Sequence, residues 1–185
     1  MRFVLASASP RRREILTKLG YSFIVHSSNA PEDDVHGTIS EKVRTLAERK
    51  AVSVAAIEKD ALIIAADTLV GLDGETLGKP KDKADAVQML KMLSGRMHEV
   101  TTGICLINTL SEQKLVSSET TYVEFREMSK NEIDEYVETG EPMDKAGSYA
   151  IQGGAAKFVK KYTGSYDNIV GFPSELFSDM LKKLI

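Results

Sequence analysis

The sequence predicts a mixed α/β fold in which helices flank one sheet. Two patterns lead to this class: strand-like apolar runs alternate with helical stripes through the first hundred residues, and two long strand-like segments then follow each other. The length of 185 residues and the hydrophobic and charged fractions of 42% and 28% suit one folded unit. We therefore expect a single domain over residues 1–185.

The first elements are expected to be a strand, a helix and a second strand. Residues 2–6 form a short apolar run, and Pro10 then opens a helix over residues 10–19, because proline is tolerated in a first helical turn. Gly20 ends this helix. Residues 23–26 are expected to form the second strand, and a polar loop follows it.

A capping box and a long apolar run dominate the next segment. Thr38 and Glu41 have the spacing of a capping box, so a helix should begin there. Its expected apolar face consists of Val43, Leu46, Ala47, Ala51 and Val54. Residues 61–70 are nearly all apolar, as in a central strand covered on both faces, and only Asp67 and Thr68 interrupt them.

The remaining elements are predicted from turns, caps and stripes. Asp73 and Gly74 indicate a hairpin turn, and Asp82 caps a helix that Gly95 ends. Its stripe is Ala86, Met89, Leu90 and Leu93. Further strands are expected over residues 100–107, 115–125 and 156–162, with a capping box at Ser129 and Glu132 before the last of them. A terminal helix should carry the stripe Leu176, Phe177, Met180, Leu181 and Leu184.

Charge and composition exclude several classes of protein. The net charge of -3 and pI near 5.7 do not suit a protein that coats nucleic acid, which needs a basic face. No segment approaches the roughly 20 apolar residues of a membrane helix, and the N-terminal apolar run is too short for a signal peptide. We expect a cytoplasmic protein, with the single Cys105 packed in the core.

The first candidate site is Ser7-Ala-Ser-Pro-Arg-Arg12, between a strand and a helix N-terminus. Unpaired N–H groups and the helix dipole favour an anion there, and arginine can clamp a phosphate with paired hydrogen bonds. The alternative is a serine cap followed by solvated arginines.

Two acidic features form the second candidate. Asp67 and Thr68 end the apolar run, and ligands gather at the carboxyl ends of strands in α/β sheets. A buried carboxylate must be paired, bind a metal or stay neutral, although an aspartate that caps the next turn is the alternative. Glu32, Asp33 or Asp34 could join Asp67 in holding Mg²⁺, unless they simply form a solvated loop.

Two glycine-containing loops could present lysines to phosphate. Gly78-Lys79-Pro80 is by itself a weak indication of a phosphate site, because an ordinary turn with an exposed lysine has the same pattern. The segment 142–154 could present Lys145 to phosphate and Gln152 to a base edge, or could be a tight connection. It matches neither a Walker nor a Rossmann fingerprint.

The three histidines lack the spacing of metal ligands, and no nucleophilic triad can be nominated from local sequence. What remains is a set of phosphate binders and carboxylates. This set favours metal-assisted attack of water on a phosphoanhydride.

The chain resembles the Maf family. The motifs that carry the resemblance are Ser9-Pro-Arg-Arg12, Ala66-Asp-Thr68, Gly78-Lys-Pro80, and Asp144-Lys-Ala-Gly147 through Ile151-Gln-Gly153. Further landmarks are Leu46-Ala47 with Lys50-Ala51, Leu93-Ser-Gly95, and Gly164-Ser-Tyr166 running to Val170-Gly171 and Pro173. The resemblance implies an elongated mixed sheet with flanking helices, two lobes around a cleft, and similarity to the inosine triphosphate pyrophosphatases.

The resemblance also implies an activity, in which a nucleoside triphosphate is hydrolysed to the monophosphate and pyrophosphate with a divalent metal, Mg²⁺, Mn²⁺ or Co²⁺. Asp67 would be the proton acceptor, and Arg11, Thr68 and Gln152 match the branch that acts on dTTP and UTP. The expected phosphate contacts are Ser7, Arg11, Arg12, Lys50, Lys79 and Lys145. The expected metal ligands are Glu32 and Asp67, with Asp33 or Asp34 as alternatives to Glu32.

Two other functions remain open at this stage. One is a regulator of septum formation that binds nucleotide or nucleic acid without turnover, and the other is a pyrophosphatase for 7-methyl-GTP. Arg11 and Gln152 argue against the second. We expect a small nucleotide as partner and neither membrane nor nucleic acid, and the sequence leaves a homodimer open.

Overall fold

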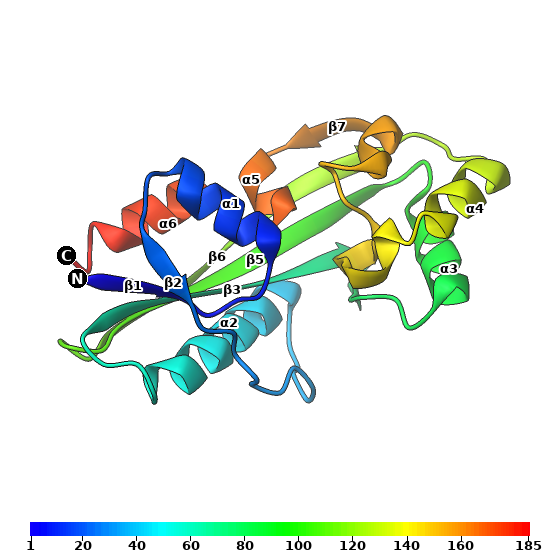
Figure 1. The fold of residues 1–185 in the computed structure, drawn as a ribbon. Coiled ribbons are helices and arrows are strands. Elements are labelled where there is room, and N and C mark those ends of the chain that lie inside the picture. The colour runs from blue at the N-terminus through cyan, green and yellow to red at the C-terminus, as the bar shows by residue number, and fades with distance from the viewer. The chain divides into compact units, whose positions relative to one another are not determined.

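The computed structural model describes all residues, 1–185, as a seven-stranded mixed sheet with six α-helices (Figure 1). The strands are β1 (Arg2–Leu5), β2 (Phe23–Val25), β3 (Ala61–Leu72), β4 (Glu75–Leu77), β5 (Met97–Asn108), β6 (Gln113–Phe125) and β7 (Val159–Thr163). The α-helices are α1 (Pro10–Lys18), α2 (Ile39–Ala55), α3 (Lys83–Leu93), α4 (Lys130–Glu138), α5 (Tyr166–Val170) and α6 (Ser174–Leu181). Three 3₁₀ helices are η1 (Glu141–Asp144), η2 (Ala146–Ser148) and η3 (Gly154–Phe158).

The sheet has the strand order β2-β1-β3-β5-β6-β7, with β4 paired to β3. β1 runs parallel to both β2 and β3, whereas the β3–β4 and β6–β7 pairs are antiparallel. Asp73 and Gly74 have φ of 52° and 83°, and they form the predicted turn between β3 and β4. No helix combines the length and the apolar character needed to cross a membrane.

The chain divides into two compact units. The first consists of residues 1–68, 102–119 and 171–185, and the second of residues 69–101 and 120–170. The expectation of one domain over residues 1–185 stays a prediction.

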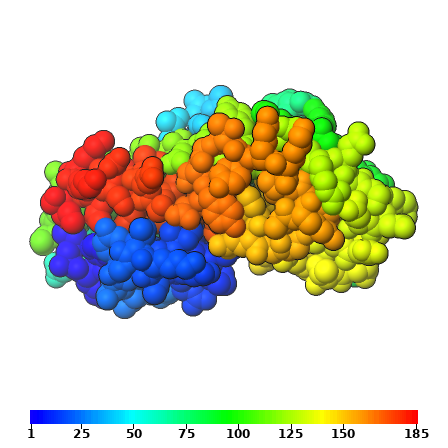
Figure 2. All heavy atoms as spheres, turned by 90° about the horizontal axis from the view of Figure 1, so that it is seen from above, coloured from blue at the N-terminus to red at the C-terminus, as the bar shows by residue number.

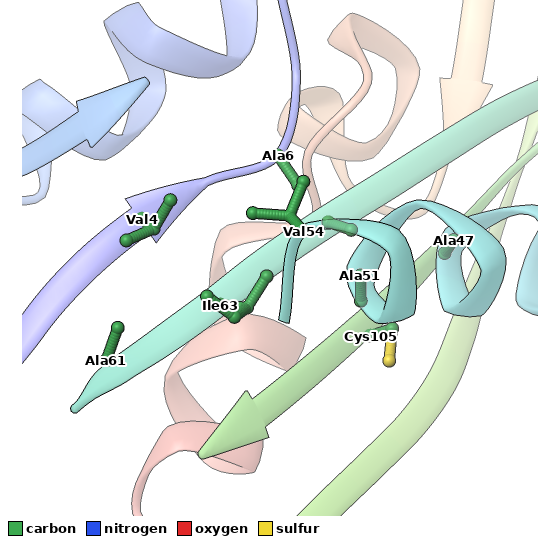
Figure 3. Packing of buried hydrophobic residues seen from close by; sticks show 9 residues of the cluster. Val4, Ala6, Ala47, Ala51, Val54, Ala61, Ile63 and Cys105 are labelled. Atoms are coloured by element: carbon green, nitrogen blue, oxygen red, sulfur yellow. The ribbon is translucent and has the colours of Figure 1, made fainter. Parts of the chain in front are cut away.

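In the first unit, α2 covers one face of the sheet, and α1 and α6 lie on the other (Figure 1). Figure 3 shows the packing under α2, where small side chains of the helix meet alternate residues of β1 and β3. This cluster is Val4, Ala6, Ala47, Ala51, Val54, Ala61, Ile63, Ala65 and Cys105. Gly103 of β5 lets the helix approach closely, because a Cβ there would lie 2.3 Å from the Val43 carbonyl oxygen.

In the second unit, α3, α4, η1 and η2 pack together, and a group of aromatic rings fills the core. The His98 ring packs edge-on against Phe125 and Tyr149. Burial lowers the pKa of His98 to about 4, so this histidine is neutral at physiological pH. Side chains of the orange segment that contains β7 project from the surface in Figure 2, in keeping with the exposure of Lys160 and Lys161.

Most of the predicted elements are confirmed, including both capping boxes and the caps at Asp82 and Gly95. One strand is misplaced: of the segment 156–162, the first three residues belong to η3, and β7 begins only at Val159. Phe158 is fully buried at the end of the 3₁₀ helix, so its apolar character reflects core packing rather than a strand. Leu184 is buried but lies beyond the end of α6.

Candidate active site

The first unit brings together an ammonium group and two carboxylates. The Nζ atom of Lys50 lies 2.5 Å from Oδ1 of Asp67 and 2.6 Å from Oε1 of Glu32. The Asp67 side chain is 9% exposed, whereas that of Glu32 is 54% exposed. Lys50 thus supplies the opposite charge that a buried carboxylate requires.

The periodicities of the two elements explain why Lys50 and Asp67 meet. Successive side chains of a strand point to opposite faces, so Asp67 lies on the same face as Ile63 and Ala65, which pack under α2. Lys50 is next to Ala51 on α2, whose apolar face covers those residues. The helix that buries the strand therefore also carries the lysine that neutralises its aspartate.

Asp67 does not lie at the end of its own strand, where the apolar run predicts it, because β3 continues to Leu72. It lies just past the carboxyl end of the neighbouring strand β1, whose last ladder residue, Leu5, pairs with Ile64. Asp67 and Thr68 thus interrupt the apolar run within the strand, and buried residues resume at Val70. The alternative of an aspartate that caps a turn is wrong, since the side chain is paired with Lys50.

Arg12 reaches four acceptors in the first unit. Its Nε donates to the Gly171 carbonyl at 2.8 Å, one Nη donates to the Ala66 carbonyl at 2.7 Å and to Ser7 Oγ at 3.1 Å, and the other Nη donates to Thr68 Oγ1 at 3.2 Å. Burial lowers the pKa of Arg12, and the charge of Asp67 opposes this shift. The solvated arginine considered from the sequence is therefore wrong for Arg12.

Thr102 is a further polar residue of this region that the sequence did not predict. Its hydroxyl lies 2.8 Å from that of Thr68, and the residue is fully buried in β5. The only signal for it was the polar pair Thr101-Thr102 at the start of an apolar segment, which resembles the interruption of β3 by Asp67 and Thr68.

The N-terminus of α1 has the properties expected for an anion site. Ser9 occupies the N-cap position without a side-chain hydrogen bond to the helix, and no acidic residue lies in the first turn. The Ser7 hydroxyl accepts from the Ser9 N–H at 3.2 Å, and Arg11 is partly buried in the first turn. The serine cap considered from the sequence is not formed.

The loop before α2 distinguishes among its three acidic residues. Only Glu32 reaches Lys50. Asp33 and Asp34 are exposed, and their backbone carbonyls accept from Arg49 at 2.7 and 3.5 Å. Among the three carboxylates considered from the sequence, the geometry favours Glu32 as the partner of Asp67.

In the second unit, the two lysine loops lie next to each other. The Gly147 N–H donates to the Gly78 carbonyl at 3.0 Å, and this contact joins the Gly78-Lys79-Pro80 turn to the Asp144–Gly147 segment. Lys79 is exposed. Lys145 is only 14% exposed, and its ammonium contacts the Asp144 carboxylate and the Glu141 carbonyl.

The segment that follows Lys145 is anchored in the core of the second unit. The Tyr149 hydroxyl bonds to His98 Nε2 at 2.8 Å, and the Ala150 N–H donates to the Tyr136 hydroxyl at 3.1 Å. Gln152, two residues further on, is exposed. A buried tyrosine and alanine thus fix a loop whose glutamine is accessible.

The residues of the first unit fit a divalent cation. Glu32 and Asp67 converge on the position of one ammonium group, and carboxylate oxygens are the ligands that Mg²⁺ prefers, together with water and substrate phosphates. No group of three or more His, Cys, Asp and Glu side chains is arranged to hold a metal ion, so a cation here would rely on two carboxylates.

Comparison with solved structures shows the class of fold. The Ham1 protein of Staphylococcus aureus is similar with a TM-score of 0.55 and 16% identity, and the match covers all of both chains. The predicted mixed sheet with flanking helices is thereby confirmed, and the chain shares its fold with the Ham1 protein.

The sequence comparison is more specific. The model of the Maf-like protein family matches residues 2–184, and the chain belongs to this family. A relative from Pelotomaculum thermopropionicum, named dTTP/UTP pyrophosphatase, is 48% identical over 97% of this chain and 95% of its own. A relative of the same name from Thermococcus gammatolerans is 51% identical over 94% and 91%. The resemblance to the Maf family is thus confirmed.

Proposed function

We propose that this protein hydrolyses dTTP and UTP to the monophosphate and pyrophosphate. The names of the relatives support this substrate class, since both are similar over more than nine-tenths of the chain. The observation that carries the proposal is the Lys50–Asp67–Glu32 group, in which a buried carboxylate and an exposed one meet a single cation.

Asp67 is the proton acceptor in this proposal. Its side chain is nearly buried and is paired with Lys50, and once Lys50 turns to a phosphate oxygen the carboxylate can take a proton from an attacking water. The bond between the α and β phosphates breaks as the water oxygen bonds to the α phosphorus, and pyrophosphate leaves. Lys50 can exchange a carboxylate for a phosphate oxygen, since its four-carbon stem is flexible.

Glu32 and Asp67 would hold the divalent metal, Mg²⁺, Mn²⁺ or Co²⁺, which would neutralise phosphate charge and favour a nucleophilic water. Ser7 and Arg11 stand at the N-terminus of α1, where the helix dipole and unpaired N–H groups favour phosphate. Lys79 and Lys145 remain predicted phosphate contacts, in keeping with the family motifs that contain them.

Specificity is assigned to Arg11, Thr68 and Gln152. The family branch for dTTP and UTP has the same three residue types, and the exposed Gln152 can offer both a donor and an acceptor to a base edge. The alternative substrate 7-methyl-GTP and the alternative role as a regulator of septum formation gain no support from the contacts described above.

A substrate panel tests the proposal. Purified protein with Mg²⁺, Mn²⁺ or Co²⁺ is incubated with dTTP, UTP, dGTP and 7-methyl-GTP, and the products are separated by ion exchange. We expect monophosphate and pyrophosphate, with dTTP and UTP turned over fastest, and a weaker preference for these two substrates in a Gln152→Ala variant. Release of orthophosphate, or a preference for 7-methyl-GTP, would contradict the assignment.

A second experiment tests the metal ligands. Glu32→Gln should raise the metal concentration needed for half-maximal activity, and Mn²⁺ binding followed by electron paramagnetic resonance should weaken in the same variant. Asp34→Asn is the matched control, because Asp34 has φ of 54° and asparagine tolerates this conformation. Equal effects in both variants would contradict the assignment of Glu32.

Cellular location, partner and oligomeric state complete the proposal. We propose a cytoplasmic enzyme with a small nucleotide as its partner, as the composition suggests. A homodimer stays a prediction.

A further inference from the structure

Most hydrogen-bond donors of the Arg12 side chain are already engaged within the protein, unlike those of a side chain that is open to a ligand. A guanidinium group carries five N–H donors, and four hydrogen bonds within the protein engage those of Arg12. All four acceptors are neutral oxygens, and no carboxylate forms a salt bridge with Arg12. By contrast, the neighbouring Arg13 is exposed and has no side-chain hydrogen bond.

Two of the four acceptors of Arg12 belong to the residues directly before and after Asp67. One is the backbone carbonyl of Ala66, and another is the hydroxyl of Thr68. Asp67 itself points to the opposite face of the strand, toward Lys50. Arg12 therefore holds the strand from the face of α1 at the position where the carboxylate projects toward α2.

The hydroxyl of Thr68 is oriented by these contacts. Because a guanidinium can only donate, the Thr68 oxygen accepts from Arg12, and the Thr68 proton is free to point to Thr102 or to a ligand. Arg12 thus sets the donor to the Thr68 oxygen, and Thr102 is one acceptor within reach of its proton. Arg12 therefore fixes the Ala66 carbonyl, which precedes Asp67, and the Thr68 side chain, which follows it.

Gly171 completes the arrangement. Its φ is 117°, a conformation that favours glycine, and in it the carbonyl oxygen accepts from Arg12 Nε. A Cβ at this position would lie 3.4 Å from Thr68 Oγ1 and 3.8 Å from Arg12 Nε. Three sequence motifs that are far apart in the chain, at Ser7–Arg12, Ala66–Thr68 and Gly171, are joined by one side chain.

We propose that Arg12 is a positioning residue that sets Asp67 and Thr68 in register for turnover, and that it is not a ligand of the triphosphate. The inference rests on the proposed function for its kinetic test. It replaces the phosphate contact that the family resemblance implied for Arg12 and leaves that role to Arg11.

The test compares Arg12→Lys with the control Arg13→Lys, at a temperature below the unfolding midpoints of both. Lysine keeps the charge but cannot span four acceptors. A positioning role predicts that kcat for dTTP falls about 100-fold in Arg12→Lys while KM changes less than about 3-fold, because small displacements of catalytic groups cost about this much. Arg13→Lys should keep the wild-type values. A KM raised by about 10-fold or more with kcat preserved, or wild-type kinetics, would overturn the proposal.

A second variant covers the case in which Arg12→Lys does not fold. Gly171→Ala keeps every charge and disturbs only the acceptor of Arg12 Nε and the space next to Thr68. Positioning predicts a lower kcat with KM unchanged in this variant. Unchanged kcat in folded Gly171→Ala would overturn the proposal.

A measurement without nucleotide separates this inference from the proposed function. Amide hydrogen exchange around Ala66 to Thr68 should be faster in Arg12→Lys than in Arg13→Lys, because only the first variant loses the hydrogen bonds to the Ala66 carbonyl and the Thr68 hydroxyl. If wild-type protein turned over no nucleoside triphosphate, the proposed function would fail, and this exchange would still test whether Arg12 holds residues 66–68 in place. Equal exchange in the two variants would overturn it.

Discussion

Gly103 is the position at which a single methyl group should do the most damage. A Cβ built there would lie 2.3 Å from the carbonyl oxygen of Val43, 2.4 Å from its carbonyl carbon and 2.8 Å from the Arg44 nitrogen. All three atoms belong to the backbone of α2, so no side chain can rotate away. Gly103→Ala therefore forces α2 away from β5.

The size of the effect follows from this geometry. Overpacking a core costs about 1–3 kcal/mol, and we expect Gly103→Ala to lose ~3 kcal/mol because the obstacle is helix backbone. For a chain of this length such a loss lowers the melting temperature by ~6–12 °C. Lys50 lies about two turns after Val43 on the same helix, so turnover should also fall at temperatures where the variant is folded.

Thermal and urea unfolding, followed by circular dichroism, measure the loss. Gly78→Ala is the control, because nothing lies within 4 Å of a Cβ at that position and its φ is not positive. We expect the control to stay within ~0.5 kcal/mol of the wild type. If Gly103→Ala were as stable as Gly78→Ala, the close approach of α2 and β5 would be refuted.

Three further results are expected. The hydrogen bonds from Arg126 lower the pKa of Glu132 to about 2, so its contribution to stability is present above the ordinary pKa of 4.5 and is lost as pH falls toward 2. Urea unfolding should therefore give a stability difference between wild type and Glu132→Gln that is constant from pH 7 to about 5 and shrinks below that. The control is Glu135→Gln, at an exposed position, for which the stability difference from wild type should not shrink in this way. Burial raises the pKa of Cys105 to about 12, so a thiol reagent at pH 8 should react only as the protein unfolds, and immediate reaction would contradict its burial. Thr38→Ala removes an N-cap and should cost about 1 kcal/mol in urea unfolding, and an unchanged midpoint would contradict the cap.

The sequence predicted local structure well because the signals are local. The capping boxes at Thr38 and Ser129 need residues only three positions apart, and both are formed. The segment 156–162 was misassigned since apolar content alone does not distinguish a 3₁₀ helix with a buried Phe158 from a strand.

The candidate site was harder to predict, because its contacts join distant segments. Asp67 was found as a polar interruption of an apolar run, but its partner Lys50 lies 17 residues away on another element. The local sequence does not distinguish Arg12, which is hydrogen-bonded within the protein, from the exposed Arg13. Thr102 was missed because one buried threonine in an apolar strand is common, and its role depends on a neighbour 34 residues away.

The central claim is that Asp67 activates water for cleavage of a nucleoside triphosphate. The most direct test is the rate of pyrophosphate release from dTTP by wild type and by Asp67→Asn, with circular dichroism to show that both are folded. Loss of a general base predicts a rate lower by about 100-fold or more in the variant. An equal rate of pyrophosphate release in folded Asp67→Asn would contradict the account.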